Sequence, residues 1–166
     1  MRDVQIPPVH EPARPWVRSH TNPPHRILVV DKDSDLRLLY ADALARPEYS
    51  VSSAEDGAVA WETLRRNRYD LLITEHDLLT LTGLELIRRV RAAHLVLPIV
   101  MAAERMPVYE LVRDPSLQLA ATLVKPFTVD ALRETVGQVL RAPDRPGRID
   151  ESPNGGRKPL ARGLQL

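Results

Sequence analysis

The segment LLITEHDLLTLTGLELIRRV, residues 71–90, decides how the chain folds, because it joins a strand to an amphipathic helix. Its first residues form a continuous run of Leu, Ile and Thr, which is typical of a strand covered on both faces. Residues 83–92 then have the apolar spacing of a helix that packs on one side. Between the two stand Glu75, His76 and Asp77, so ionisable groups follow directly after a hydrophobic strand.

The same order of strand and helix recurs along the middle of the chain. The predicted strands are residues 26–30, 48–54, 69–74, 97–102 and 120–124. The predicted helices are residues 35–44, 56–67, 83–92, 107–113 and 129–140. Ser34 and Thr128 are the expected N-caps of the first and last helices, and Leu39 is expected on the inward face of the first. Right-handed connections between such units predict a doubly wound five-stranded parallel sheet with helices on both faces.

Composition excludes several classes of protein. The chain has 166 residues, enough for one ordinary domain, and no cysteine, which excludes disulfides, cysteine-ligated zinc and thiol catalysis. Its longest apolar stretch, residues 95–103, is far shorter than the ~20 residues that span a bilayer. The N-terminus has no apolar region typical of a secretory signal. We therefore expect a cytoplasmic protein that does not enter a membrane.

The two ends differ from the middle in composition. Residues 1–25 and 142–166 hold ten of the fifteen prolines and few large apolar residues, so we expect both to be disordered. Residues 26–141 form the predicted domain, and the stretch after it is too short for an output domain. Between Ile27 and Leu140 there are 13 Lys and Arg against 17 Asp and Glu, so an acidic body carries two basic ends. The ends lack interleaved aromatic residues, and we do not expect a nucleic-acid partner.

Charged side chains gather where the predicted strands end. Asp31 and Lys32 follow the first strand, Glu75 and Asp77 follow the third, and Lys125 follows the fifth. In an open parallel sheet, ligands and chemistry gather at this carboxyl edge. Solvent exposure explains one or two such charges, but not a Lys-Pro-Phe sequence placed opposite two acidic clusters.

Four segments of the chain resemble, in order and spacing, the receiver domain of bacterial two-component response regulators. They are ILVVDKDSDLRLLY, YDLLITEHDLLTLTGLELIRRVR, LPIVMAAE and LVKPFTVDALRETV. Further landmarks are Gly83, eight residues after Glu75, the Lys125-Pro126 turn, and the 22-residue interval from Ala103 to Lys125. The resemblance covers about residues 26–141 and implies a flavodoxin-like fold. It also implies a phosphoacceptor aspartate, two acids that hold Mg²⁺, a Thr or Ser, a Lys and a switching aromatic.

At most of those positions this sequence departs from the family. Glu75 stands at the phosphoacceptor position, and Lys32 stands where a metal ligand is expected. Ala103 replaces the Thr or Ser, and Thr122 replaces the switching aromatic. Asp31 and Lys125 keep the expected residue types.

Lys32 decides the expected chemistry of this pocket. An ammonium group repels Mg²⁺ and offers it no donor, so we expect metal binding to be lost and no cofactor to be used. We expect Lys32 to bridge Asp31 and Glu75 instead, so that with Lys125 two carboxylates face two ammonium groups. The sequence thus predicts a receiver fold without a phosphorylation switch.

Other interpretations stay open. Glu75 could imitate the phosphorylated state, or a histidine kinase could still phosphorylate the domain, with Asp77 as one candidate acceptor. His76 is expected to be solvated rather than a metal ligand. An enzyme would need a nucleophile with a base, a phosphate loop or a metal, and the sequence has no such arrangement.

The resemblance implies that the domain acts through binding. The expected partner is a histidine kinase, an output protein or a second copy of the chain. The expected contact surface is the face formed by the fourth helix, fifth strand and fifth helix.

Overall fold

The computed structural model describes residues 23–142, and within them five parallel strands form one sheet in the order β2-β1-β3-β4-β5. The strands are β1 (His25–Val30), β2 (Tyr49–Ala54), β3 (Leu71–Thr74), β4 (Ile99–Ala103) and β5 (Ala121–Val124). The helices are α1 (Ser34–Ala43), α2 (Gly57–Arg66), α3 (Gly83–Ala92), α4 (Val108–Arg113) and α5 (Val129–Arg141), with a 3₁₀ helix η1 (Pro115–Leu117). The predicted doubly wound parallel sheet is confirmed. The expected disorder of the ends concerns residues that lie almost wholly outside the described range.

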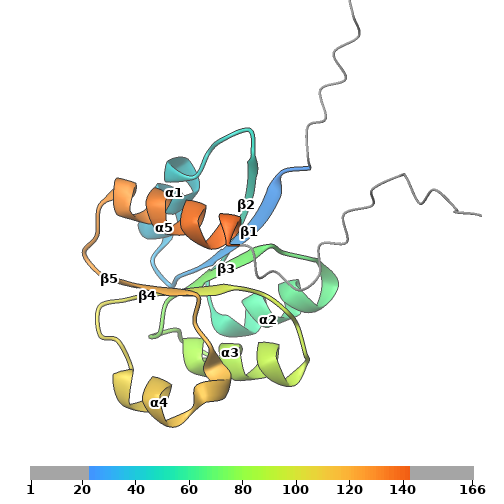
Figure 1. Cartoon of the computed structure of the whole chain (residues 1–166), viewed down its shortest axis with the longest axis vertical. Coiled ribbons are helices and arrows are strands. Elements are labelled where there is room, and N and C mark those ends of the chain that lie inside the picture. The colour runs from blue at the N-terminus through green and yellow to red at the C-terminus, as the bar shows by residue number, and fades with distance from the viewer. Residues whose placement is uncertain (1–22, 143–166) are drawn as a thin grey trace, which may run out of the picture.

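The helices cover both faces of the sheet. Figure 1 shows α1 and α5 on one face, with α2 and α3 on the other and α4 on that same side. The change in direction of strand order lies at β1, because β2 is on one side of β1 and β3 on the other. Such a switch point opens a crevice at the carboxyl ends of the neighbouring strands.

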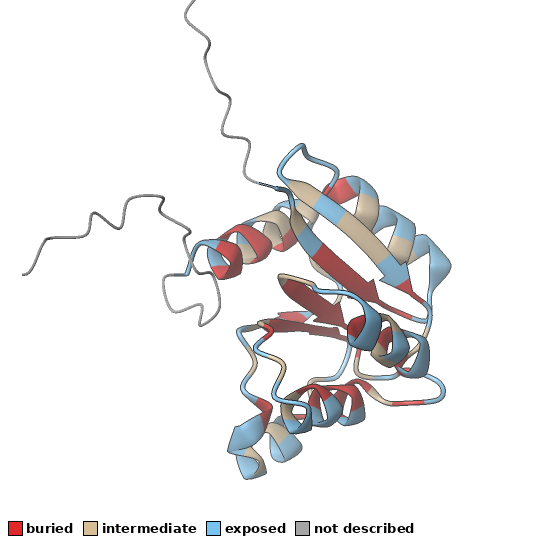
Figure 2. Ribbon diagram, turned by 90° about the vertical axis from the view of Figure 1, so that its right-hand side faces the viewer, coloured by how far each residue is buried: buried red, intermediate tan, exposed pale blue. Residues whose placement is uncertain are grey.

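The sheet separates two hydrophobic cores, because alternate side chains of a strand point to opposite faces. In β1, Ile27 and Val29 belong to the core under α1 and α5, whereas Leu28 and Val30 belong to the core under α2 and α3. All residues of β3 and β4 are buried, as expected for central strands of a parallel sheet. Figure 2 shows this burial along the middle of the sheet.

Capping side chains fix where the helices begin. Thr128 is the N-cap of α5, as predicted, and accepts a hydrogen bond from the Ala131 N–H. The prediction for α1 is wrong by one residue, because the Asp33 carboxylate is the N-cap and Ser34 is the first helical residue. Thr82 and Glu85 form a capping box at the start of α3. The hydrogen bond from the Thr82 N–H lowers the pKa of Glu85.

Two further details differ from the prediction. Leu39 of α1 is 47% exposed and does not join the core; α1 contributes Tyr40 and Ala43 to it. The 3₁₀ helix before β5 was not predicted, since a single turn at Pro115 gives no helical periodicity in the sequence.

Candidate functional site

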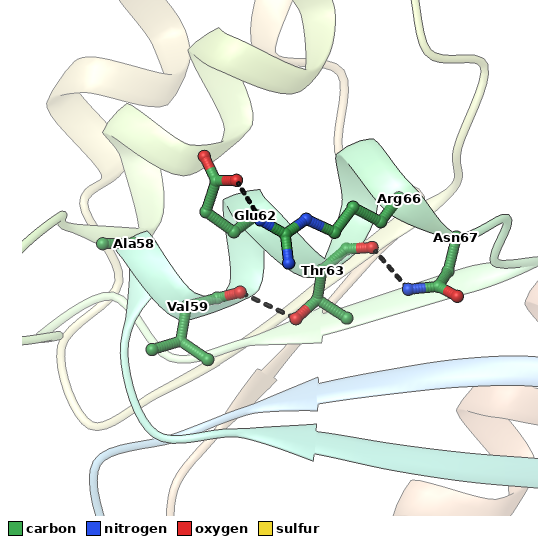
Figure 3. A pocket seen from close by; sticks show the side chains of 6 residues that line it. All are labelled: Ala58, Val59, Glu62, Thr63, Arg66 and Asn67. Carbon is green, nitrogen blue, oxygen red and sulfur yellow. Dashed lines mark hydrogen bonds and ion pairs between the residues drawn. The ribbon is translucent and has the colours of Figure 1, made fainter.

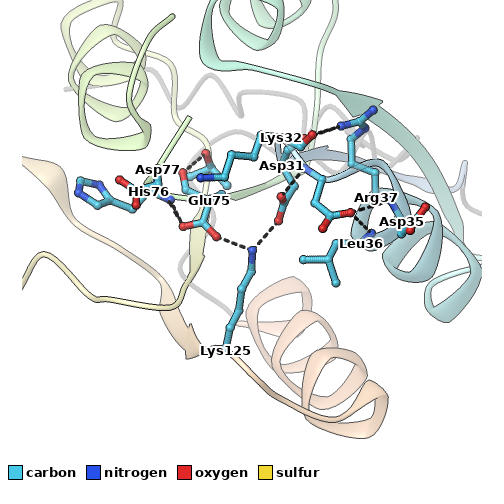
Figure 4. Close-up of polar contacts among 11 residues, drawn as sticks. Asp31, Lys32, Asp35, Leu36, Arg37, Glu75, His76, Asp77 and Lys125 are labelled. Atoms are coloured by element: carbon cyan, nitrogen blue, oxygen red, sulfur yellow. Dashed lines mark hydrogen bonds and ion pairs between the residues drawn. The ribbon is translucent and has the colours of Figure 1, made fainter. Parts of the chain in front are cut away.

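The carboxyl ends of four strands place the predicted site residues together at one edge of the sheet. Asp31 directly follows β1, Glu75 follows β3, and Lys125 follows β5, while Ala103 is the last residue of β4. Figure 4 shows the Lys125 side chain reaching between the carboxylates of Asp31 and Glu75. Segments as far apart in sequence as residues 31 and 125 therefore meet in one cluster.

Lys125 is the centre of this cluster. Its Nζ donates a hydrogen bond of 2.6 Å to Asp31 Oδ2 and a second one to Glu75 Oε2. The side chains are 12% exposed for Lys125, 3% for Asp31 and 7% for Glu75. Buried charges of this kind persist only when they are paired and hydrogen-bonded. We name these three residues the Lys125 cluster.

Backbone N–H groups satisfy the remaining carboxylate oxygens. Asp31 Oδ1 accepts from the Asp33 N–H at 3.0 Å. Glu75 Oε1 accepts from the His76 N–H at 2.6 Å and the Asp77 N–H at 3.3 Å. The Glu75 side chain thus turns back on its own loop, and all four carboxylate oxygens of the cluster accept a hydrogen bond.

The cluster makes stability depend on pH. Burial alone lowers the pKa of Lys125, but the hydrogen bonds and negative charges of Asp31 and Glu75 outweigh burial and raise it overall. The stabilising contribution is therefore complete below the ordinary lysine pKa of about 10.4. It is lost as the pH rises through the higher pKa of the folded state.

Lys32 does not take the place expected for it. Its side chain is exposed, and among residues 23–142 it forms no ion pair with Asp31 or Glu75. In Figure 4 its side chain runs from the end of β1 toward the loop that carries Glu75 and Asp77, whereas Lys125 is the residue that reaches between the two carboxylates. One ammonium group, not two, holds the carboxylates.

The remaining predicted residues surround the cluster without bonding to its charged atoms through their side chains. Ala103 is fully buried and offers no hydroxyl group, and Thr122 of β5 is exposed. Asp77 is exposed and contributes its backbone N–H to Glu75. Pro126 follows Lys125 in the loop before α5 and is exposed.

Gly83 lies so close to the loop after β3 that no side chain fits. A Cβ atom at this position would lie 2.2 Å from the carbonyl oxygen of Glu75 and 3.0 Å from His76 Cα. The Gly83 N–H also donates to the His76 carbonyl at 2.9 Å. The start of α3 thus holds the loop that carries Glu75.

His76 differs from the solvated side chain expected. It is half-buried, and its Nδ1 atom is enclosed without a hydrogen-bond partner among the described residues. Figure 4 shows the imidazole pointing away from the Lys125 cluster, so His76 contributes only its backbone N–H.

Two contacts beside the cluster were missed from the sequence. The rings of Tyr40 and Phe127 stack with centroids 5.6 Å apart, and Phe127 belongs to the same Lys-Pro-Phe segment as Lys125. The Arg37 guanidinium donates to the carbonyl of Asp31 at 2.7 Å and so fixes the loop after β1. The predicted inward position of Tyr40 on the first helix could have indicated the stacking. A hydrogen bond from an Arg side chain to a backbone carbonyl, by contrast, produces no recognisable pattern in the sequence.

The donor set does not fit the divalent cation that the resemblance implies. Mg²⁺ needs several hard oxygen ligands in near-octahedral geometry. One carboxylate oxygen of Asp31 and one of Glu75 are held by Lys125, and the expected second acid is Lys32. Within residues 23–142, no group of three or more His, Cys, Asp or Glu side chains is arranged to hold a metal ion.

Tyr40 provides a direct probe of the environment beside the cluster. Burial raises its pKa to about 12; the charge of Lys125 opposes this, and those of Asp31 and Glu75 add to it. The folded state therefore holds this proton more tightly than the unfolded chain, so stability falls as the pH rises from about 10 toward that value.

We expect Tyr40→Phe to remove the last step of the tyrosinate absorbance titration of the folded protein. Loss of an earlier step would contradict this environment.

Comparison with known proteins agrees with the fold. The response regulator receiver domain matches residues 27–137. The chemotaxis protein CheY homologue of Campylobacter jejuni is 33% identical over 119 residues, covering 69% of this chain and 92% of that protein. CheY1 of Helicobacter pylori is 33% identical over 123 residues, covering 72% of this chain and 99% of that protein.

Solved structures agree as well. CheY4 of Vibrio cholerae has a TM-score of 0.63 at 25% identity, covering 70% of this chain and 98% of that one. TrrA of Thermotoga maritima, solved in complex with Mg(2+)-BeF, has a TM-score of 0.61 at 27% identity, covering 69% of this chain and 98% of that one.

The chain belongs to the response regulator receiver domain family. Its described part is a CheY-like receiver domain, a module of two-component signalling. No helix within residues 23–142 is long and apolar enough to cross a bilayer.

Proposed function

We propose that this receiver domain works as a protein-interaction module in two-component signalling, without phosphorylation of an aspartate and without Mg²⁺. The observation that carries the proposal is the Lys125 cluster, in which one lysine holds both carboxylates through hydrogen bonds. With Lys32 at the position of the second acid, these two carboxylates leave too few free oxygen ligands for the Mg²⁺ that phosphoryl transfer in this family uses. Ala103 adds to this, because it has no hydroxyl group with which to bind a phosphoryl oxygen. The proposed place of action is the cytoplasm.

Two alternatives receive less support. A constitutive mimic of the phosphorylated state requires Glu75 to extend toward the phosphoryl position, whereas its carboxylate turns back to the N–H groups of His76 and Asp77. Phosphorylation of Asp77 requires metal ligands around it, and Asp77 lies exposed outside the cluster (Figure 4).

The proposed docking surface is the face formed by α4, β5 and α5. Large apolar side chains are exposed on α4 and β5: Val108 at 60%, Tyr109 at 66%, Val112 at 74% and Val124 at 59%. A gathering of exposed apolar residues marks an interaction site more often than chance exposure does. The proposed occupant is a histidine kinase, an output protein or a second copy of this domain.

A phosphodonor experiment tests the proposal. The full chain is incubated with radiolabelled acetyl phosphate and Mg²⁺, and acid-labile phosphate on the protein is measured together with the melting temperature as Mg²⁺ is added. We expect no incorporation and no shift. The matched variant carries Lys32→Asp, Glu75→Asp and Ala103→Thr, which supply the missing groups, and we expect it to gain both responses.

Two results of the same experiment would contradict the proposed function. Stable acyl-phosphate on Glu75 or Asp77 of the unchanged chain would show that a phosphorylation switch persists. A Mg²⁺-dependent rise in its melting temperature would show that the carboxylates still accept a cation.

A further inference from the structure

A large groove lies at the amino ends of the strands, at the edge of the sheet opposite the Lys125 cluster. It encloses about 1180 Å³ and is lined by the start of β1, the connections that lead into β3, β4 and β5, and the end of α5. Segments from five different parts of the chain thus form one continuous concave surface.

The charge of the groove is strongly one-sided. Among the described residues that line it, Asp70 is the one acidic side chain. The basic side chains are all arginines: Arg26, Arg65, Arg66, Arg68 and Arg91. The predicted domain as a whole is acidic, so this concentration of arginine does not follow from its overall composition.

Three of these arginines have structural roles. Arg91 donates to the carbonyls of Leu97 and Gln118 at 2.9 and 2.8 Å and joins the loops before β4 and β5. Arg65 and Arg66 lie in the last turn of α2 and both pair with Glu62. Figure 3 shows the Glu62–Arg66 pair on the outer surface of α2. Cations in a last turn also offset the helix dipole, so these residues alone would not indicate a ligand.

Arg26 and Arg68 have no such role. Arg26 lies in β1, and its guanidinium stacks over the Tyr69 ring at 5.0 Å from the centroid. Arg68 lies in the connection after α2, is exposed, and makes no ion pair or side-chain hydrogen bond within residues 23–142. Neither is in a last helical turn. Two arginines are therefore presented to the groove with their hydrogen-bonding capacity largely unused.

The floor of the groove is apolar. Leu95 and Leu119 are half-buried there, and Val96 is 65% exposed at its side. Half of the lining side chains are aliphatic or proline, and Tyr69 is the single aromatic among those described. A polyanion that binds by stacking would have one ring available, whereas an aliphatic side chain of a peptide finds an extended surface.

We infer that this groove binds an acidic protein segment that carries aliphatic side chains. Carboxylates of the segment pair with Arg26 and Arg68, and its apolar residues rest on Leu95, Val96 and Leu119. The groove exceeds the usual 300–1,000 Å³ of small-ligand pockets, which favours an extended peptide. The inference does not depend on whether the opposite edge accepts a phosphoryl group.

The test uses the full chain and a short fluorescein-labelled peptide of alternating Glu and Leu, followed by fluorescence anisotropy. Binding should weaken as salt is raised. The double variant Arg26→Gln with Arg68→Gln should weaken binding by about tenfold. Val96→Glu should weaken it about equally through like-charge repulsion. The matched control Arg46→Gln with Arg105→Gln removes the same charge outside the groove and should change binding by less than about twofold.

Other probes separate this inference from its competitors. A peptide of alternating Glu and Ser should bind about tenfold more weakly, because it lacks aliphatic contacts. Equal effects of the two double variants would overturn the inference, as would no binding at low salt. Tighter binding of single-stranded oligothymidine would also overturn it and assign the arginines to nucleic acid.

Discussion

Lys125→Met should lower the free energy of unfolding by about 3–5 kcal/mol, measured by urea denaturation near neutral pH. The reason is that the substitution leaves Asp31 and Glu75 as two buried carboxylates without a cation. Methionine has a similar length and fills much of the space of the lysine stem. The loss of stability therefore comes from the missing charge rather than from a cavity.

Lys32→Met is the matched control. It removes the same charge one residue from Asp31, but the side chain is exposed and has no ion-pair partner in the described residues, so we expect a change within about 0.5 kcal/mol. Adding Asp31→Asn and Glu75→Gln to Lys125→Met should recover most of the loss by removing the unpaired charges. Similar losses for the two lysine variants would show that the buried bridge is not what stabilises this edge.

Gly83→Ala should lower the free energy of unfolding by about 2–4 kcal/mol, a steric effect of the overpacking kind. The new Cβ would lie 2.2 Å from the Glu75 carbonyl oxygen, and a backbone atom cannot move aside as a flexible side chain can. The loop after β3 would have to shift, and Glu75 with it. Urea denaturation measures the loss, and the Tyr40 titration reports whether the cluster has changed.

Gly137→Ala provides the opposite expectation in the same protein. Its Cβ would meet the end of the Arg141 side chain, at 2.8 Å from a guanidinium nitrogen, and that side chain can turn away. Alanine favours a helix interior over glycine by about 1 kcal/mol, so this variant should be neutral or more stable. If Gly83→Ala were equally neutral, the close approach of α3 to the loop after β3 would be refuted.

The sequence was sufficient for the architecture because each element carries a strong local signal. The apolar run of residues 26–30 and the cap at Thr128 correspond to β1 and α5 with shifts of one residue at most. The meeting of Asp31, Glu75 and Lys125 followed from the rule that parallel strands end at a common edge, and their hydrogen bonds agree with that prediction.

What could not be predicted depends on side-chain direction and on packing. Lys32 was expected to bridge Asp31 and Glu75 because it stands at a metal-ligand position of the family, yet its side chain is exposed and forms no ion pair with either within residues 23–142. Leu39 fits the helical spacing of α1, but the core at that level is filled by Tyr40. Arg65, Arg66 and Arg68 of the groove are neighbours in sequence, but Arg26 and Arg91 come from distant segments, so the sequence does not show that the five line one surface.

The sheet separates two hydrophobic cores, one on each face, and no buried side chain belongs to both. Tyr40 and Phe127, which lie beside the Lys125 cluster, belong to the core under α1 and α5. Leu64, Leu95 and Leu119 of the arginine-rich groove belong to the core under α2 and α3, whereas Val139, at the other side of the groove, belongs to the core under α1 and α5. A substitution that changes the packing of one core can therefore affect the packing of the other only by shifting the strand backbone between them. Each face of the sheet can therefore change its packing residues while the strands between the two faces keep the same backbone path.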